Sequence, residues 1–287
     1  MAVTGLRSHA PTPLNQEPAL RLDDCPVMLG SSMVTKVRFT YDSSRCTPNE
    51  RVEPLLACCA HYGRSDRPLF IAGYNELCRL DLNGGKVLEV CCGVGQLALA
   101  VSRAFPNAEV IACDRYPNAG QAIREAALQG GPGNLLYRCG DAVRLGEVPD
   151  GSLDLVYGQA TLHHLAHDTM AVREEFWRVL KPGGRLVFIY EPFGHNPFWA
   201  MIRAYRIARA KMADESNLTM TQLEEVAEPF RACEVQAFNL TAYPLKYLGR
   251  VAGWPVIYAI HRWDRAIMKR WPRMTHWAAN FNVIFTK

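Results

Sequence analysis

Between residues 86 and 190 the chain alternates short apolar runs with longer segments of amphipathic character. Gly, Pro, Asn or Asp residues bound the apolar runs, as is typical of buried strands, and the intervening segments have helical spacing. Strands that alternate with helices of this length predict parallel βαβ units in one sheet. The expected strands are residues 86–91, 109–113, 135–139, 153–158 and 185–190, and the expected helices are residues 96–105, 119–129 and 169–180.

The flanks of this alternating region add more helices and two more strands. The helices are expected at residues 52–62, 70–80 and 197–211. A capping box at Thr221 to Glu224 indicates one further helix start. Residues 233–241 and 280–287 complete a set of seven strands. The predicted fold is therefore α/β: a Rossmann-like, doubly wound, mostly parallel seven-stranded sheet with an antiparallel C-terminal strand.

One large domain is expected, because no linker composition interrupts this series within the 287 residues. The polar, proline-containing residues 1–20 predict a disordered tail, and residues 21–82 predict a helical N-terminal cap. Residues 83–287 form the main domain, with a helical insertion at residues 243–277 before the last strand.

Composition narrows the class of protein only slightly. With 49% hydrophobic residues, 21% charged residues and a net charge of +4, the chain has the composition of an ordinary globular protein. Its ten cysteines include no CxxC pair, so we expect no metal site and reduced thiols in a cytoplasmic protein. The longest apolar stretch, residues 252–260, is about half of the ~20 residues that a membrane-spanning helix requires.

A glycine-rich turn follows the first strand of the alternating region. Gly93-x-Gly95-x-x-Ala98 fits a nucleotide-binding fingerprint, and Asp114 follows at the end of the next strand, where it can bind ribose hydroxyls. Glu89 places a carboxylate inside the first strand, and a buried carboxylate is costly unless it is paired. S-adenosylmethionine carries an ammonium group that can pair with it, whereas NAD does not. The turn therefore favours S-adenosylmethionine.

Further motifs follow in order along the chain. They are Gly140-Asp141-Ala142 after the third strand, the strand motif at residues 150–157, His163-His164, and Lys181-Pro182-Gly183-Gly184. Together with the turn they resemble the class I S-adenosylmethionine-dependent methyltransferases, in particular the small-molecule branch. The resemblance covers residues 86–192 and implies methyl transfer to a small or amphipathic metabolite, with S-adenosylhomocysteine as the second product.

The resemblance also implies which residues bind the cofactor. Those at the methionine end are Glu89, Cys91, Gly93, Gly95 and the backbone of Gln159. Asp114 is expected at the ribose, Asp141 and Ala142 are expected at the adenine, and Arg115 is a further cofactor-binding candidate. One position departs from the family pattern, which usually has glycine where this chain has Cys91. If this turn needs a positive φ at Cys91, strain on the order of 1 kcal/mol follows.

Candidate catalytic residues lie where the fourth and fifth strands of the alternating region end. A general base is needed only when the acceptor is protonated, and then contributes roughly 10²–10⁴-fold. His163 follows the fourth strand, and Glu191 and His195 follow the fifth. Each also has a structural interpretation, as a packing or loop-capping residue. Tyr41 and Phe39 are candidates to contact the sulfonium by cation–π interaction, or else core residues.

Residues 243–277 carry seven Lys or Arg residues against one acid, Asp264. Apolar residues recur there at helical spacing, so a basic amphipathic helix with tryptophans is expected. Such a helix can pack on its own sheet, contact a membrane surface, or bind an anionic partner. No nucleic-acid recognition motif is present, and monomer and homodimer stay open. Two alternative functions also stay open: a peripheral-membrane lipid or quinone methyltransferase, and a cofactor-binding protein that catalyses a non-methylating reaction.

Overall fold

The computed structural model describes residues 37–41, 43–58, 66–194, 196–210, 217–241 and 254–287. All of them belong to one compact unit, Ser31–Lys287. The tail expected at residues 1–20 and the candidate His195 lie outside the described residues.

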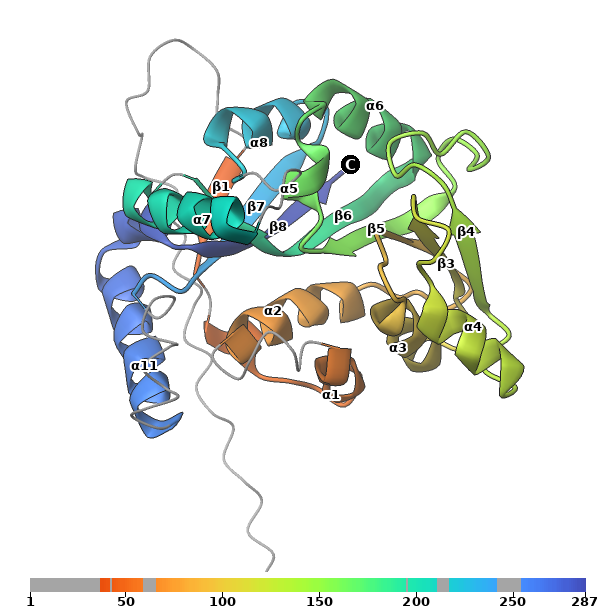
Figure 1. The fold of residues 1–287 in the computed structure, drawn as a ribbon, viewed down its shortest axis with the longest axis horizontal. Coiled ribbons are helices and arrows are strands. Elements are labelled where there is room, and N and C mark those ends of the chain that lie inside the picture. Colours follow the sequence, from red (N-terminus) through yellow and green to blue (C-terminus); the bar gives the residue numbers. More distant parts are fainter. Residues whose placement is uncertain (1–36, 42, 59–65, 195, 211–216, 242–253) are drawn as a thin grey trace, which may run out of the picture. The chain divides into compact units, whose positions relative to one another are not determined.

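A single eight-stranded sheet organises this unit, in the order β1-β7-β8-β6-β5-β2-β3-β4 (Figure 1). Neighbouring strands are parallel except at β8, which runs antiparallel to both β6 and β7. The strands are β1 (Val37–Thr40), β2 (Lys86–Val90), β3 (Glu109–Asp114), β4 (Leu135–Cys139), β5 (Leu153–Gln159), β6 (Leu180–Pro192), β7 (Ala232–Phe238) and β8 (Asn280–Thr286). The predicted doubly wound, mostly parallel sheet with an antiparallel C-terminal strand is confirmed.

The predicted strand number was one too low. The additional strand is β1, which pairs with β7 at one edge of the sheet and lies within the region expected to be a helical cap. Four residues that pair on one side only give a weak sequence signal. Phe39 nevertheless fixes the strand, because its buried ring packs against Phe193 and Phe281 at centroid distances of 6.4 and 5.7 Å.

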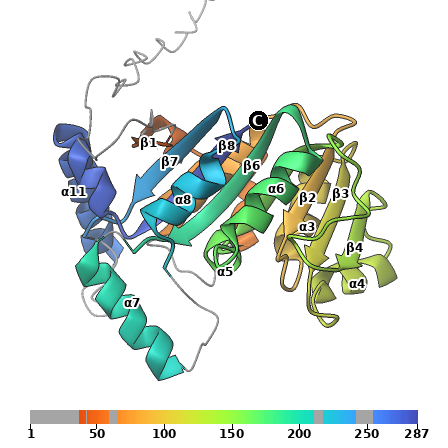
Figure 2. The same cartoon turned by 90° about the horizontal axis from the view of Figure 1, so that it is seen from above.

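Helices cover both faces of the sheet. Figures 1 and 2 show α1 to α4 on one face and α5, α6 and α8 on the other. The helices are α1 (Val52–Leu55), α2 (Arg67–Cys78), α3 (Gln96–Ala104), α4 (Gln121–Leu128), α5 (Leu162–Leu165), α6 (Thr169–Val179), α7 (Pro197–Ala210), α8 (Met220–Ala227) and α11 (Trp254–Arg270), with 3-10 helices η1 (Ser43–Cys46) and η4 (Pro272–Trp277). Both views place α7 and α11 at the same end of the unit, away from α3 and α4.

The central strand β2 explains why a site forms at its end. Leu88 and Val90 pack in the hydrophobic core on one face, and Val87 packs in the core on the other, because successive strand residues point to opposite faces. β2 lies between β5 and β3, where the strand order reverses direction. Open α/β sheets bind ligands at such a switch point, beyond the carboxyl ends of the strands.

Helix α8 begins two residues before the position that the sequence indicated. Thr219 has an extended backbone and caps the helix: its Oγ1 accepts from the Gln222 N–H at 3.2 Å, and Gln222 Oε1 accepts from the Thr219 N–H at 2.9 Å. Thr221 therefore lies inside the helix. The sequence contains two overlapping motifs of capping-box spacing, and local pattern alone did not separate them. No helix in the described part of the chain has both the length and the apolarity to cross a bilayer.

Candidate active site

A cavity of about 430 Å³ opens at the carboxyl ends of β2, β5 and β6. The β2 turn, the β5–α5 connection and the end of β6 each contribute to its wall, and α7 adds Arg203. The lining residues are Cys58, Glu89, Cys91, Cys92, Gly93, Val94, Gln96, Leu97, Gln159, Ala160, His163, His164, Tyr190, Pro192 and Arg203. Five predicted site residues from two segments of the chain thus line one space: Glu89, Cys91, Gly93, Gln159 and His163.

Glu89 is a buried carboxyl group in the wall of this cavity, with only 3% of its surface exposed. Its Oε2 accepts a long hydrogen bond of 3.4 Å from the Tyr157 hydroxyl. Burial raises the pKa of Glu89 to about 8, because the donors at Tyr157 and the Ala98 backbone compensate only partly and Asp114 adds a like charge. Glu89 is therefore protonated at neutral pH until a cation lies beside it.

The turn after β2 holds three residues in the left-handed region. Cys91 and Gly93 both have φ near +53°, and Gly95 has φ of +84°. A Cβ on Gly95 would lie 2.6 Å from Ile123, so both the backbone angle and the contact with α4 require glycine. Cys91 does adopt the positive φ that makes a side chain costly. Burial raises the pKa of its thiol to about 12, so the side chain is neutral.

Asp114 joins the ends of β3 and β2. Its Oδ2 accepts from the Gly93 N–H at 2.9 Å and its Oδ1 accepts from the Tyr116 N–H at 3.0 Å. Arg115 is exposed, and its guanidinium donates to the Tyr116 hydroxyl at 2.8 Å. Neither Asp114 nor Arg115 is among the cavity-lining residues. The ribose contact of Asp114 and cofactor binding by Arg115 stay predictions, and the structure adds a second role for Asp114 in fixing the turn.

Asp141 and Ala142 lie just beyond β4. Asp141 is exposed and its Oδ1 accepts from the Val143 N–H at 3.0 Å, while Ala142 is buried in the core. Like Asp114, they do not line the cavity. Their assignment to the adenine stays a prediction.

Gln159 ends β5 and lines the cavity. Its side-chain oxygen accepts from the Tyr74 hydroxyl at 2.7 Å, and its backbone oxygen accepts from Thr161 Oγ1 at 3.2 Å. Tyr74 is a fully buried residue of α2. Helix α2 therefore positions the Gln159 side chain through the Tyr74 hydroxyl.

His163 and Glu191 form a buried pair. Glu191 has no exposed surface, and its Oε2 lies 2.7 Å from His163 Nδ1. The same carboxylate accepts from the backbone N–H groups of Thr161, Leu162 and His163 at 2.8, 3.0 and 3.1 Å. Burial alone would raise the pKa of Glu191, but His163 and the backbone donors outweigh it and hold the pKa below its usual value.

An ionised Glu191 determines the tautomer of His163. Because a carboxylate only accepts hydrogen bonds, Nδ1 of His163 carries the proton that lies between the two side chains. In the neutral ring the lone pair is then on Nε2. His163 and the adjacent His164, whose ring centroid is 4.1 Å away, both line the cavity. The arrangement can accept a proton from a bound molecule.

Tyr41 is half-buried and packs edge-on against Phe238, at a centroid distance of 6.2 Å. It contacts both hydrophobic cores and does not line the cavity. Its contact with a sulfonium stays a prediction.

The sequence interpretation missed several wall residues. Tyr190, which directly precedes Glu191, has φ of +65° and donates from its hydroxyl to Asp66 Oδ2 at 3.4 Å. A tyrosine at the end of a predicted strand could have been noticed. Cys58 and Arg203 come from segments whose approach to this edge depends on tertiary packing. No local signal marks them.

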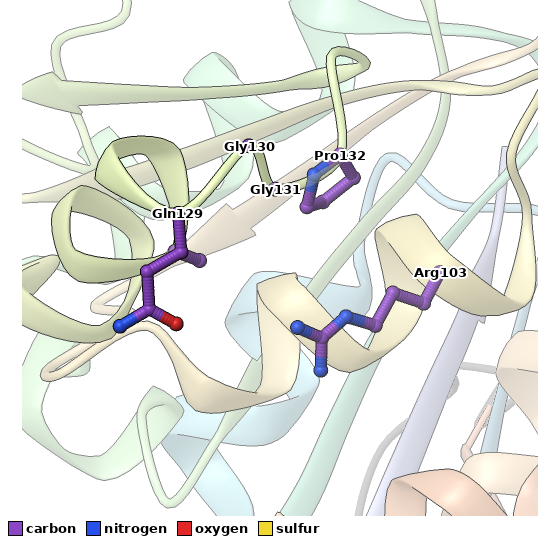
Figure 3. Close-up of a pocket in the computed structure, with 6 residues that line it drawn as sticks. Arg103, Gln129, Gly130, Gly131 and Pro132 are labelled. Atoms are coloured by element: carbon purple, nitrogen blue, oxygen red, sulfur yellow. The ribbon is translucent and has the colours of Figure 1, made fainter.

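A second hollow, of about 390 Å³, lies between α3 and the loop that follows α4 (Figure 3). Arg103, Gln129, Gly130, Gly131 and Pro132 surround it, together with Ala126. The loop leads into β4, so this hollow lies at the amino ends of the strands. Arg103 is its one ionisable side chain. It lacks the acid and base groups that converge in the other cavity.

Comparison with known proteins identifies a methyltransferase domain in this chain. A family model described as a methyltransferase domain matches residues 87–184. The chain is 35% identical over 123 residues to demethylmenaquinone methyltransferase of Deinococcus radiodurans, covering 42% of this chain and 49% of that protein. It is 33% identical over 165 residues to a sterol 24-C-methyltransferase of Aspergillus fumigatus, covering 55% of this chain and 40% of that protein.

The chain thus spans less than half the length of these two relatives. Among solved structures, the fold matches a phosphoethanolamine N-methyltransferase of Haemonchus contortus in complex with S-adenosyl-L-methionine. The TM-score is 0.53 at 18% identity, over 81% of this chain and 56% of the other. Residues 87–184 thus match a methyltransferase domain, and the strand order and the motifs of the β2 turn resemble those of the class I S-adenosylmethionine-dependent methyltransferases.

Proposed function

We propose that this protein transfers a methyl group from S-adenosylmethionine to a small or amphipathic metabolite. The observation that carries the proposal is the cavity in which the glycine turn with Glu89 and the His163–Glu191 pair meet. A donor site and an acid–base pair on one space fit group transfer. The Haemonchus contortus protein with the matching fold holds this cofactor.

The residues of the turn fit this cofactor. Glu89 is buried with a raised pKa, so an ammonium group beside it would stabilise the ionised carboxylate. Glu89, Cys91, Gly93, Gly95 and the Gln159 backbone would hold the methionine end, Asp114 the ribose, and Asp141 with Ala142 the adenine, with Arg115 as a further cofactor-binding candidate. When bound, the cofactor supplies a methyl group that is already activated on a sulfonium.

The chain's own residues then align the acceptor and manage its proton. In-line geometry is the main requirement, because proximity and orientation contribute up to ~7–11 kcal/mol in favourable systems. Glu191 holds the His163 ring through Nδ1–H, so Nε2 is the ring atom that would take a proton from an acceptor O–H, N–H, S–H or C–H group. Glu191 stays ionised and stabilises the imidazolium that forms. An acceptor that carries no such proton needs only the positioning.

The names of the relatives support an amphipathic acceptor over a fully polar one. Two of them are named for demethylmenaquinone and for a sterol, which both have extended apolar skeletons. Arg203 lines the cavity beside apolar groups such as Leu97 and Pro192, so polar and apolar parts of one acceptor can both be contacted. We therefore place a lipid-like or quinone-like metabolite ahead of a fully polar one.

Calorimetry with S-adenosylmethionine and, separately, with NAD tests the donor. We expect binding of the first and none of the second; binding of NAD alone would overturn the assignment. Incubation with candidate quinols and phenols, followed by assay of S-adenosylhomocysteine, tests transfer. Cofactor binding without S-adenosylhomocysteine across such a panel would instead favour a non-methylating protein.

A further inference from the structure

Helix α11 and the following η4 present a surface of exposed tryptophans. Trp263 is 64% exposed, Trp271 is 55% exposed and Trp277 is 45% exposed. Val256 and Met274 add exposed apolar area to the same two elements. Large aromatic side chains usually bury most of their area, so several exposed ones on neighbouring elements indicate an interaction surface.

The same elements carry a strong positive charge. Arg262, Arg265, Lys269, Arg270 and Arg273 are all exposed. The one acid in residues 254–277 is Asp264, and it is removed from the surface: it is 1% exposed, and both its oxygens accept from the Thr241 N–H, at 2.9 and 3.0 Å. The exposed charged side chains of this segment are thus all basic.

Helical spacing divides α11 into three faces. Ile260, Asp264, Ile267 and Met268 form the face that packs on the protein. Arg262, Arg265 and Lys269, at i, i+3 and i+7, form an exposed basic face.

Val256, Ala259, Trp263 and Ala266, at i, i+3, i+7 and i+10, form an exposed apolar face beside it. Packing onto the sheet requires only the first face. It therefore leaves the adjoining basic and apolar faces of α11 unexplained.

We propose that α11 and η4 dock this surface onto an anionic lipid bilayer. Tryptophans suit the boundary between headgroups and acyl chains, and the basic face beside them complements anionic lipid headgroups. No helix in the described ranges is both long and apolar enough to span a bilayer, and the proposed contact is with the bilayer surface. Charge complementarity together with an apolar face selects a lipid surface over a purely polyanionic partner.

Helix α7 connects this surface with the cavity. Asn196, just before α7, donates from Nδ2 to the Trp277 backbone oxygen at 3.0 Å, and Trp199 packs on Ala279, just after η4. Arg203 of α7 lines the cavity, while Met201 and Tyr205 of the same helix are exposed. The proposed membrane contact depends only on the exposed surface of α11 and η4. The further step, that this contact brings a lipid-held acceptor to the cavity, rests on the proposed function.

Vesicle sedimentation tests the contact without any need for activity. We expect the full chain to sediment with vesicles of 30% phosphatidylglycerol in phosphatidylcholine, and much less with pure phosphatidylcholine. Since each basic residue near an anionic surface contributes about 1 kcal/mol, or roughly fivefold, Arg265→Glu with Lys269→Glu should weaken binding by at least about 25-fold. Trp263→Ala should weaken it roughly tenfold, because it removes apolar area from the interface.

Matched variants elsewhere on the surface provide the controls. Arg103→Glu with Arg231→Glu changes the net charge equally, and Trp177→Ala removes a partly exposed tryptophan of α6. Both should leave sedimentation unchanged, and circular dichroism verifies that every variant is folded. Equal binding of all variants, or equal binding to neutral vesicles, would overturn the proposal. Tighter binding to RNA or DNA than to vesicles would also overturn it. So would the finding that the chain forms a dimer instead of binding vesicles, and that the α11 substitutions abolish this dimer.

Discussion

Two buried carboxyl groups line or adjoin the same cavity, yet they differ in charge. Glu89 at the end of β2 has one long side-chain hydrogen bond, and its pKa is raised to about 8. Glu191 at the end of β6 accepts from three backbone N–H groups and from His163, and its pKa is lowered. Burial is nearly equal, so the number of donors decides the ionisation state. At neutral pH, Glu89 would ionise only beside a cation, whereas Glu191 is already ionised by the donors around it.

The same substitution at both positions is the strongest test of this difference. Glu191→Gln turns an amide N–H₂ toward groups that are themselves donors, so we expect a loss of about 3 kcal/mol in the free energy of unfolding. Glu89→Gln replaces a protonated carboxyl by a neutral group of similar shape and should cost less than about 1 kcal/mol at pH 5, where the wild-type carboxyl is protonated at little cost. Urea unfolding measures both. Equal losses at the two positions would contradict the assigned charges.

The pH dependence of stability should separate the two groups. Because the pKa of Glu89 is raised to about 8, its contribution is complete below the unfolded value near 4.5 and is lost as the pH rises toward 8. The slope is about 1.4 kcal/mol per pH unit. Glu191 has a lowered pKa, so its contribution is present above about 4.5 and is lost as the pH falls through its folded pKa.

Urea midpoints measured from pH 3 to pH 9 test this. Glu89→Gln should remove most of the alkaline decline and leave the acid side unchanged. If Glu89→Gln showed the same alkaline decline as the wild type, the raised pKa of Glu89 would be wrong.

Cofactor binding should release a proton from Glu89. At pH 7 a group with a pKa near 8 is mostly protonated, and an ammonium group beside it favours the ionised form, so up to about one proton is released. Calorimetry in two buffers of different ionisation enthalpy counts it. Glu89→Gln should abolish the release and weaken S-adenosylmethionine binding roughly tenfold. An unchanged proton count in Glu89→Gln would assign the proton to another group.

Backbone strain near Glu89 gives the smallest expected effect. Cys91→Gly removes a side chain from a residue with φ near +53° and should stabilise the protein by about 1 kcal/mol. Gly93→Ala is the matched control, since Gly93 has the same φ and no atom within 4 Å of an added Cβ. It should destabilise by a similar amount. Thermal unfolding measures both, and a destabilised Cys91→Gly would show that the thiol contributes more through packing than the angle costs.

Features that depend on residues close together in the chain could be predicted from the sequence. Glu89, the left-handed turn and the alternation of strands and helices all follow from residues a few positions apart. The edge strand β1 did not, because its partner β7 lies nearly 200 residues away. Asp114 was predicted as a ribose ligand, but its hydrogen bond to Gly93 across two parallel strands has no local signature. The pairing of His163 with Glu191, 28 residues apart, likewise depends on the packing of β5 beside β6.

Helix α5 is only four residues long and owes its position to a side chain from another strand. Three of its first N–H groups, from Thr161 to His163, donate to Glu191, and the pairing of Gln159 with Ile189 brings that carboxylate to the helix start. A shift of β6 by one residue would move Glu191 by about 3.3 Å and turn it to the opposite face of the sheet. The alignment of two strands therefore sets which nitrogen of His163 carries the proton.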